Sequence, residues 1–453
     1  MRKVLIANRG EIACRVIRTC RKLGLSTVAV YSEADREALH VQLADAARSI
    51  GPSPARESYL AGDRIIAAAK ESGADAIHPG YGFLSENSGF AQAVSAAGIC
   101  WIGPTAQTIA DMGDKERARQ LAEAAGLPIL AGSPRFTPDN LHELAAAAAV
   151  VGYPLLVKAA AGGGGIGMRR LDAVGELEKT VIATQKLAEK SFGDPGVYLE
   201  QFVDPARHIE IQVFGLGDGR AVHLFERECS IQRRFQKIIE ESPAPGLPDS
   251  VRNAMGEVAV ALASQQRYVG AGTIEFVVDV DHRFYFLEMN TRIQVEHPVT
   301  EMVTGLDLVE LQIRLARGDD LSFLTQQAIN ISGHAIECRI YAENPAKNFL
   351  PSPGRLTQFQ PPATSDSIRV DSGFRTGDNI SFHYDPMITK VIVRGGERDG
   401  ALDRMTSALD DFRIEGVATN IGFLRNTIAH PVFRTGKTFT RFVDTYMSEL
   451  LGH

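Results

Sequence analysis

Short apolar runs alternate with helical patterns over the first quarter of the chain. Residues 4–7 are apolar, a helix-like spacing of apolar residues follows from 12 to 23, and residues 27–31 read as a second strand. The alternation continues through apolar runs at 76–78 and 99–102, with a helical pattern at 90–97 between them. This order predicts a doubly wound α/β domain over residues 1–114, whose ligand edge lies at the carboxyl ends of its strands.

The pattern changes after residue 114. Residues 115–130 are typical of a helical link, and residues 132–203 form a compact α+β segment with an alanine-rich helix near 141–151, which we expect to act as a mobile lid. Residues 209–330 read as strands that carry most of the candidate charged residues, and the region 331–453 reads as mainly β. A chain of 453 residues exceeds the size of one hydrophobic core, so we expect an α/β and α+β multidomain protein with domains at 1–114, 115–330 and 331–453.

Composition narrows the class of protein. Apolar residues make up 44% and charged residues 23%, as in ordinary globular proteins. The net charge of −7 offers no general attraction to nucleic acid or to an anionic membrane surface, so an anionic ligand needs a local cationic site. The sequence has no run of about 20 apolar residues, no signal-peptide pattern and no disulfide or metal spacing among its cysteines, which predicts a cytoplasmic protein.

A glycine-rich turn follows an apolar strand that ends in Lys158. The turn contains Gly162, Gly163, Gly164 and Gly165, and such a turn lets backbone N–H groups approach phosphate oxygens while the lysine adds a positive charge. It lacks the Gly-Lys-Ser/Thr ending of a Walker A loop. A flexible hairpin without a ligand is the alternative interpretation.

Two β-rich runs flank Asp281-His282 and predict a β-hairpin. If these two residues form the turn, Glu275 lies directly opposite Glu288, and Asn290 follows on the same face. Facing carboxylates destabilise a sheet unless a proton or a cation lies between them, and oxygen ligands suit Mg²⁺ held jointly with phosphates. We therefore predict a metal at these three side chains. The alternative is a solvated acidic pair, against which the apolar neighbours of Glu288 argue.

Arg292, Gln294 and Glu296 occupy alternate positions after this hairpin. In an extended backbone all three side chains point the same way as Glu288. Arg292 can then fork onto a small planar anion, Gln294 can donate an amide hydrogen bond to it, and Glu296 stays available as a base. The same alternation also occurs on ordinary solvated strand faces, which is the alternative interpretation.

Four longer motifs extend this pattern, and together they resemble biotin carboxylase. They are HPGYGFLSEN at 78–87, MGDK at 112–115, ERECSIQRR at 226–234 and EMNTRIQVEHPVTE at 288–301. The resemblance covers nearly the whole chain. It implies a pre-ATP-grasp domain at the N-terminus, an ATP-grasp domain with a lid, and a C-terminal biotin carboxylase domain. It also implies a ligase that uses ATP and bicarbonate to carboxylate biotin on a separate carrier protein, the first half-reaction of a biotin-dependent carboxylase.

The resemblance assigns roles to individual positions. It implies that ATP is surrounded by Lys115, Lys158, Gly162, Gly163, Gly164, Gly165, Glu200, Gln201, Phe202, Val203, His208, Gln232 and Lys237. Glu275, Glu288 and Asn290 would hold Mg²⁺, with Mn²⁺ as the alternative ion. Arg292, Gln294 and the Val295 backbone would bind bicarbonate, Glu296 would deprotonate it, and Arg339 would stabilise the biotin enolate. Taken singly, such lysines, arginines and histidines are more often surface or packing residues.

The implied reaction begins when bicarbonate attacks the γ-phosphate of ATP to give carboxyphosphate, while cations neutralise the charge on the transferred group. Carboxyphosphate then releases CO₂ beside biotin, its phosphate takes the biotin N–H proton, and the lid keeps water out. The expected partners are a biotin carboxyl carrier protein, carboxyltransferase subunits and a second copy of this chain. The carboxyltransferase, and not this chain, selects the final carboxyl acceptor.

Two positions depart from the family pattern. Ile166 stands where the glycine loop usually carries Lys or Arg, which predicts a weaker phosphate contact in the lid, and Phe235 stands where bacterial relatives often carry His. Two other functions fit parts of the sequence. One is a biotin-independent ATP-grasp ligase, for instance one that makes carbamoyl phosphate. The other is a catalytically silent nucleotide-binding subunit, against which the full set of candidate catalytic residues argues.

The chain lacks a site for its own biotinylation. No Met-Lys dipeptide occurs in it, whereas the biotinylated lysine of the family's carrier domain typically lies in Met-Lys-Met. We therefore expect no covalent biotin on the purified polypeptide. A streptavidin blot with a biotinylated carrier protein as positive control checks this, and a band at the mass of this chain would contradict it.

Overall fold

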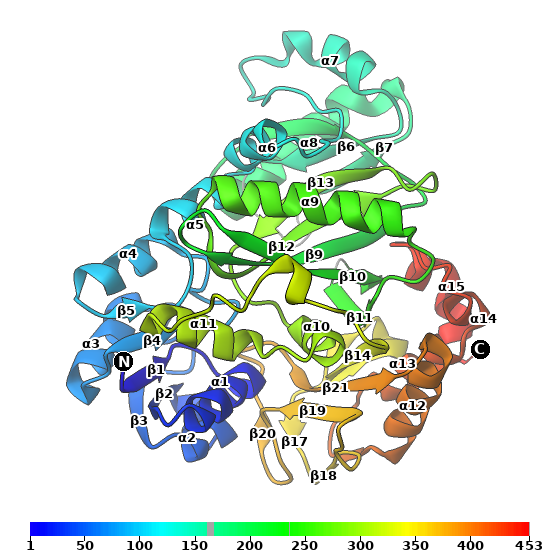
Figure 1. The fold of residues 1–453 in the computed structure, drawn as a ribbon. Helices are drawn as coiled ribbons and strands as arrows, with labels where there is room; N and C mark the ends of the chain where they lie inside the picture. Colours follow the sequence, from blue (N-terminus) through cyan, green and yellow to red (C-terminus); the bar gives the residue numbers. More distant parts are fainter. Residues whose placement is uncertain (161–166, 235, 453) are drawn as a thin grey trace.

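The computed structural model describes residues 1–160, 167–234 and 236–452 (Figure 1). Its first part is a parallel sheet in the order β3-β2-β1-β4-β5. Successive strand residues face opposite sides: Val4 and Ile6 pack with α1, whereas Leu5 packs with α3 and α4. The doubly wound arrangement is therefore confirmed. The elements are β1 (Lys3–Ile6), α1 (Gly10–Lys22), β2 (Ser26–Ser32), α2 (Leu39–Leu43), β3 (Ala46–Gly51), α3 (Gly62–Ser72), β4 (Ala76–His78), α4 (Ser88–Ala96), β5 (Cys100–Trp101), α5 (Ala106–Gly113) and α6 (Lys115–Ala124).

The loops at the carboxyl ends of β1 and β4 contact one another. Asn8, directly after β1, donates through Nδ2 to the carbonyl oxygens of Pro79 and Tyr81, 2.8 and 2.7 Å away. Gly80 between them has a φ of 64°, and a Cβ at this position would lie 2.9 Å from Asn8 Nδ2, so the close approach of the two loops requires glycine. Both loops line one large cavity, as expected for strand carboxyl ends.

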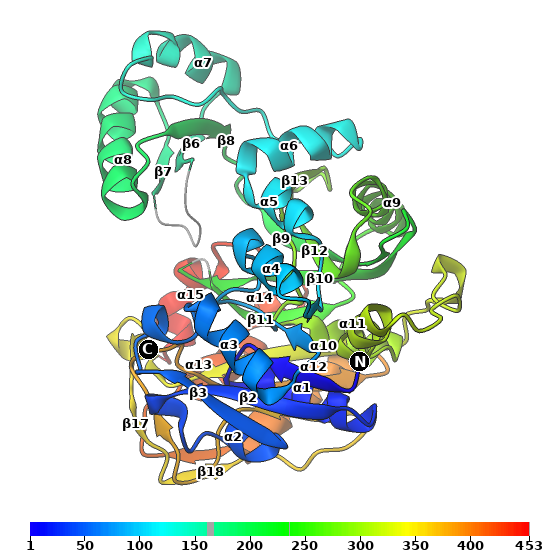
Figure 2. The ribbon, with the colours of Figure 1, turned by 90° about the vertical axis from the view of Figure 1, so that its left-hand side faces the viewer.

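A separate lobe follows, and Figure 2 shows it standing away from the rest of the chain. Its three-stranded antiparallel sheet has the order β7-β6-β8. It has its own hydrophobic core, in which Leu155 and Val157 of the sheet pack with Leu144 and Val181 of the helices. The elements are α7 (Leu144–Val151), β6 (Leu155–Ala159), β7 (Met168–Leu171), α8 (Leu177–Phe192) and β8 (Val197–Gln201). This lobe corresponds to the predicted lid segment.

One eight-stranded sheet forms the centre of the molecule, in the order β13-β12-β9-β10-β11-β14-β21-β19. The strands are β9 (Arg207–Leu216), β10 (Ala221–Arg233), β11 (Gln236–Ser242), β12 (Val269–Val278), β13 (Phe284–Asn290), β14 (His334–Tyr341), β19 (Ile368–Ser372) and β21 (Met387–Gly395). The helices between them are α9 (Asp249–Gln265), α10 (His297–Thr304) and α11 (Leu308–Arg317). Because β11 pairs with β14, the sheet continues from the middle of the chain into its C-terminal part.

The C-terminal part begins with strands and ends with helices. Its short strands are β15 (Glu343–Asn344), β16 (Leu350–Pro351), β17 (Gly354–Arg355), β18 (Gln358–Gln360), β20 (Asn379–Ile380) and β22 (Arg413–Glu415). Its helices are α12 (Arg398–Asp411), α13 (Ile421–Ala429), α14 (Pro431–Arg434) and α15 (Phe442–Leu450), which pack on β14 and β21 through a shared core. The sequence predicts a mainly β region here; the strands are present, but the last third is helical.

Short 3₁₀ helices complete the described elements, at Glu33–Asp35, Ala55–Glu57, Leu141–Glu143, Val174–Glu176, Gln326–Ala328 and Pro345–Lys347. Within the described ranges, no helix combines the length and the hydrophobicity that crossing a membrane requires.

The predicted hairpin forms, with a different turn. β12 and β13 pair so that Glu275 lies opposite Glu288, as the sequence predicts. The two-residue turn is wrong, because β12 ends at Val278 and β13 begins at Phe284. A one-residue shift in register beyond Glu275 compensates for the longer turn, since Phe276 pairs with Phe286 and Leu287 is the extra residue of a β-bulge. Glu275 and Glu288 therefore stay paired as predicted, because the bulge at Leu287 lies between this pair and the turn.

Candidate functional site

A cavity of about 760 Å³ lies where the N-terminal sheet, the eight-stranded sheet and the C-terminal region meet. Residues from all three predicted domains line it, including Tyr81 from the N-terminal part and Tyr384 from the C-terminal part. Ten of the predicted site residues lie on its wall: His208, Lys237, Glu275, Glu288, Asn290, Arg292, Gln294, Val295, Glu296 and Arg339. The structure therefore brings these ten positions together around one cavity.

The acidic pair on β12 and β13 is set in a ring of polar partners. Glu275 Oε1 accepts hydrogen bonds from Asn290 Nδ2 and Gln294 Nε2, each 2.9 Å away, and Glu275 Oε2 lies 2.9 Å from His208 Nε2. Glu288 opens onto the cavity, where its recessed position and the negative charge of Glu275 raise its pKa. Two facing carboxylates with this repulsion fit a divalent cation.

Lys237 joins three carboxylates across the sheet. Its Nζ donates to Glu210 at 2.5 Å, to Glu275 at 2.7 Å and to Glu296 at 2.8 Å. Burial alone would lower the pKa of Lys237, but the three acidic neighbours raise it well above the usual range. Lys237 is therefore a fixed positive charge between the acidic pair and Glu296.

The segment after β13 is not extended throughout. It turns at Val295 and Glu296, and Glu296 is the N-cap residue of α10 with φ −81° and ψ 5°. The predicted extended backbone is therefore wrong at its end, although Arg292, Gln294 and Glu296 all reach the cavity. Arg292 donates to Glu86 at 2.8 Å and to Asn290 Oδ1 at 3.0 Å, so part of its guanidinium group is already hydrogen-bonded.

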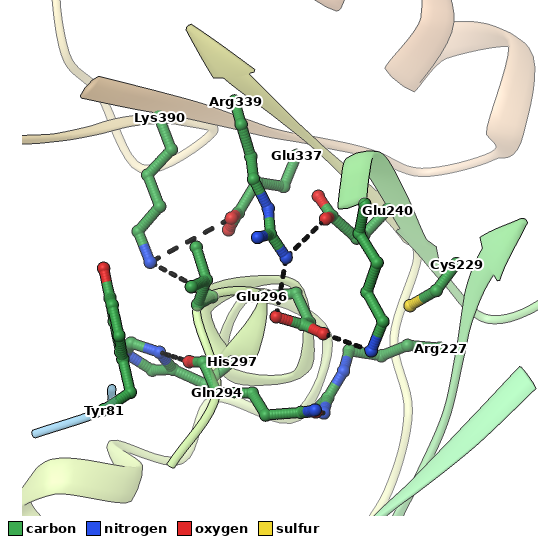
Figure 3. A network of polar contacts seen from close by, with 12 residues as sticks. Tyr81, Arg227, Cys229, Glu240, Gln294, Glu296, His297, Glu337, Arg339 and Lys390 are labelled. Carbon is green, nitrogen blue, oxygen red and sulfur yellow. Dashed lines mark hydrogen bonds and ion pairs between the residues drawn. The ribbon is translucent and has the colours of Figure 1, made fainter. Parts of the chain in front are cut away.

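Glu296 and Arg339 form the centre of the polar network in Figure 3. Arg339 Nη2 donates to Glu296 Oε2 at 2.7 Å, and Lys237 holds the other oxygen of the same carboxylate. Burial alone would raise the pKa of Glu296, but Lys237 and Arg339 hold it well below its usual range. Glu296 is therefore ionised at neutral pH, which is the protonation state that a base requires.

A second cationic group lies toward the lid. Lys158 on β6 donates to Glu200 at 2.7 Å, and Arg119 donates to the other oxygen of this carboxylate at 3.2 Å. Lys115 begins α6, and its pKa is lowered by partial burial and by the positive charge of Lys158. The charges of Lys158 and Glu200 therefore act on Lys115, in the region where the sequence predicts the nucleotide.

The remaining predicted nucleotide contacts divide into two groups. His208 Nδ1 and Gln232 Nε2 lie 2.9 Å apart, next to the acidic pair. The backbone N–H of Gln201 donates to Ala131, and that of Phe202 donates to Pro154, at the end of β8. Val203 directly follows this segment. Gly162, Gly163, Gly164 and Gly165 of the glycine loop, with Ile166 and Phe235, lie outside the described residues.

The sequence analysis did not predict two residues that hold the site residues in place. Arg227 is fully buried and donates to Gln294 Oε1 at 2.9 Å and to Glu210 at 2.5 Å, so it orients one proposed anion ligand. Glu86 fixes Arg292 from the N-terminal domain. Both lie inside the quoted motifs, but only tertiary contacts reveal what they touch. The alternation of side chains on β10 places Arg227 on the same face as Cys229, and this pattern was the available sequence signal that Arg227 points inward.

Three family profiles match successive parts of the chain. Residues 1–109 match "Biotin carboxylase, N-terminal domain", residues 114–324 match "Carbamoyl-phosphate synthase L chain, ATP binding domain", and residues 337–445 match "Biotin carboxylase C-terminal domain". The middle profile is shared with the rival carbamoyl phosphate ligases, whereas the two flanking profiles distinguish biotin carboxylases from them.

Relatives agree with this division. Biotin carboxylase 1 of Bacillus subtilis is 50% identical over 447 residues, which covers 98% of this chain and 99% of that protein. The mouse methylcrotonoyl-CoA carboxylase subunit alpha, a mitochondrial protein, is 50% identical over 99% of this chain, but this chain spans only 62% of its length.

Solved structures agree as well. The biotin carboxylase domain dimer of Hydrogenobacter thermophilus 2-oxoglutarate carboxylase, in complex with MgADP, ADP and bicarbonate, has a TM-score of 0.94 at 44% identity and covers 99% of this chain and 98% of that one. The biotin carboxylase of Campylobacter jejuni, in complex with an ATP analogue, has a TM-score of 0.92 at 43% identity, with 98% of each chain covered. Together with the full-length match in Bacillus subtilis, these results show that the chain belongs to the biotin carboxylase family.

Proposed function

We propose that this chain carboxylates biotin with ATP and bicarbonate, giving carboxybiotin, ADP and phosphate as the first half-reaction of a biotin-dependent carboxylase. The observation that carries the proposal is the ion pair between Glu296 and Arg339 beside the acidic pair Glu275 and Glu288, all on one cavity wall. A base, an anion-stabilising guanidinium and a metal-binding pair then lie within one site. The relatives and solved structures of this family support the same activity.

The residues divide the chemistry among them. Arg292, Gln294 and the Val295 backbone bind bicarbonate, and the ionised Glu296 takes its proton. Lys115, Lys158, Lys237, His208 and Gln232 surround the nucleotide, with Glu200, Gln201, Phe202 and Val203 at the adenine, and the lysines neutralise charge on the transferred phosphoryl group. Arg339 stabilises the negative charge that develops on biotin. Gly162, Gly163, Gly164 and Gly165 belong to the proposed ATP site, and the proposed lid keeps water from carboxyphosphate.

The proposed metal site consists of Glu275 and Glu288, with Asn290 beside them. The donor set fits Mg²⁺, because the two glutamates are paired across the strands and the charge of Glu275 raises the pKa of Glu288. When bound, the ion would neutralise phosphate charge together with the lysines. Asn290 Oδ1 accepts a hydrogen bond from Arg292 Nη2, so this amide holds the arginine beside the proposed metal site.

The domain division and the partners are proposed from the family to which the chain belongs. The proposed domains are 1–114, 115–330 with a lid at 132–203, and 331–453. The proposed partners are a biotin carboxyl carrier protein, carboxyltransferase subunits and a second copy of this chain; the Hydrogenobacter domain is a dimer, which supports the last. A cytoplasmic location stays a prediction, since the relatives include mitochondrial and bacterial proteins.

The proposed activity predicts how ATP hydrolysis responds to its substrates. ADP formation should require bicarbonate and Mg²⁺ and should rise further on addition of free biotin, because carboxyphosphate is consumed productively only when biotin is present. A coupled ADP assay measures this. Hydrolysis that needs bicarbonate but ignores biotin would indicate a biotin-independent ligase, and no ADP in a single turnover would indicate a silent nucleotide-binding subunit.

Glu288→Gln should separate metal binding from folding. Without metal, removing one of two facing charges relieves repulsion, so the melting temperature in metal-free buffer should stay the same or rise. Binding of MgADP should weaken roughly tenfold or more, whereas binding of ADP without Mg²⁺ should not change. Calorimetric titration with and without Mg²⁺ tests this, and equal weakening in both titrations would show that Glu288 does not act through the metal.

A further inference from the structure

Behind the proposed biotin-facing arginine lies a second pair of facing carboxylates that the reaction does not use. Glu240 on β11 pairs directly with Glu337 on β14, and both side chains are fully buried. Among the described residues, their four carboxylate oxygens accept no hydrogen bond of good geometry, although Arg339 Nη2 lies 2.7 Å from Glu240 Oε1. Two ionised carboxylates in this position are strongly unfavourable, because buried like charges repel one another.

The cations nearby are already used by other groups. Lys237 is shared by Glu210, Glu275 and Glu296. Lys390 on β21 donates to the carbonyl oxygen of Val295 and lies 3.4 Å from Glu11, but 4.0 Å from Glu337. Figure 3 shows Arg339 between Glu296 and Glu240. Arg339 Nη2 lies 2.7 Å from Glu240 Oε1, so Glu240 has the closer cation of the two carboxylates.

The charged and titratable groups that face the pair come from five elements. They are Lys237 on β11, Cys229 on β10, Arg339 on β14, Lys390 on β21, and Glu296 and His297 at the start of α10. Cys338, between Glu337 and Arg339 in the chain, points into the hydrophobic core on the other face of the sheet. Buried Cys229 and His297 are neutral near pH 7, because burial raises the pKa of the thiol and lowers that of the imidazole.

We propose that Glu337 holds a proton, whereas Glu240 is ionised and positions Arg339 for the biotin step. This rests on the role proposed above for Arg339. When Glu296 takes the bicarbonate proton, it becomes neutral and its ion pair with Arg339 weakens. Glu240 keeps its charge and its contact with the guanidinium, so Arg339 stays in place while negative charge develops on biotin.

Two isosteric variants on paired strands test the proposal. Glu337→Gln replaces a protonated acid by a neutral amide of the same shape, so biotin-dependent turnover should stay within about threefold of wild type. Glu240→Gln removes the charge that holds Arg339 and should lower biotin-dependent kcat by about tenfold or more. Biotin-independent, bicarbonate-dependent ATP hydrolysis and the KM for ATP should change little in both variants. Equal losses in both variants, or a larger loss in Glu337→Gln, would overturn the proposal.

The pH profile adds a readout that a structural role would not move. Burial raises the pKa of Glu240 to about 7, against the opposing effect of Arg339. A carboxyl group is ionised above its pKa, so the contact with Arg339 is present at higher pH and is lost as the pH falls through this value. The biotin-dependent rate of wild type should therefore decline on the acid side near this pH, and Glu240→Gln should lack that decline. An identical acid limb in the variant would contradict the assignment.

Infrared spectroscopy tests for the proton on Glu337 without an activity assay. At pH 8 the wild-type protein should show the C=O stretch of a buried protonated carboxylic acid, and Glu337→Gln should lose it. This band tests the protonation of Glu337 even if the Glu240→Gln variant does not fold. It also does so if the wild-type protein shows no bicarbonate-dependent ATP hydrolysis, a result that would refute only the proposed function. Absence of the band in wild type would overturn the proposal.

Discussion

Glu296→Gln should reduce biotin-dependent turnover by about 10²- to 10⁴-fold, the usual cost of removing a general base. The amide keeps the size of the carboxylate, but only its oxygen can accept a hydrogen bond, from either Lys237 or Arg339, which lie 2.8 and 2.7 Å from the two carboxylate oxygens. It cannot take a proton from bicarbonate. Steady-state assays of carboxybiotin formation measure the loss.

The KM for ATP provides the control for this variant. It should stay near the wild-type value, since Lys237 keeps its contacts with Glu210 and Glu275 when the charge of Glu296 is removed. A variant that keeps more than roughly a tenth of the wild-type rate would show that another residue takes the bicarbonate proton.

Arg339→Ala should slow carboxylation of biotin by about 10²- to 10³-fold, as loss of an oxyanion donor does. Arg339 lines the cavity from β14 and forms ion pairs with Glu240 and Glu296, whereas Lys158 pairs with Glu200. Biotin-independent ATP hydrolysis should therefore survive. The two rates are measured on the same preparation.

Arg339→Lys is the matched variant, because it keeps the positive charge and loses the planar fork. It should retain more activity than Arg339→Ala while staying below wild type. Equal loss of both ATP hydrolysis and biotin carboxylation in Arg339→Ala would instead assign Arg339 a structural role, since the buried carboxylates Glu240 and Glu296 would then lose their shared cation.

Local pattern was enough to predict those parts of the protein in which neighbours in the chain are also neighbours in space. The alternation of short strands and helices predicted the N-terminal sheet, and the hairpin pattern placed Glu275 opposite Glu288. The turn was wrong, because a β-bulge at Leu287 leaves no mark in the spacing of polar residues. The turn at Glu296 was missed for a similar reason, since the same residues also fit an extended strand.

Contacts between distant segments could not be predicted in this way. Glu86 reaches Arg292 across more than 200 residues of chain, and Glu240 meets Glu337 only because β11 pairs with β14. In the sequence, Glu240 is one of two adjacent glutamates on a strand, which is typical of an exposed edge. Its burial depends on the order of eight strands in one sheet, which no local pattern specifies.

The pairing of β11 with β14 also limits how the chain can be divided. Separation at residue 330 would expose the backbone N–H and C=O groups of both strands, and an unpaired strand of this kind is a template for aggregation. The middle and C-terminal regions are therefore one cooperative unit of unfolding, and exchange of either region between relatives would have to preserve the strand register at this seam. The lobe of β6, β7 and β8 has a sheet and a core of its own, so it can open at a lower free energy while the remainder stays folded.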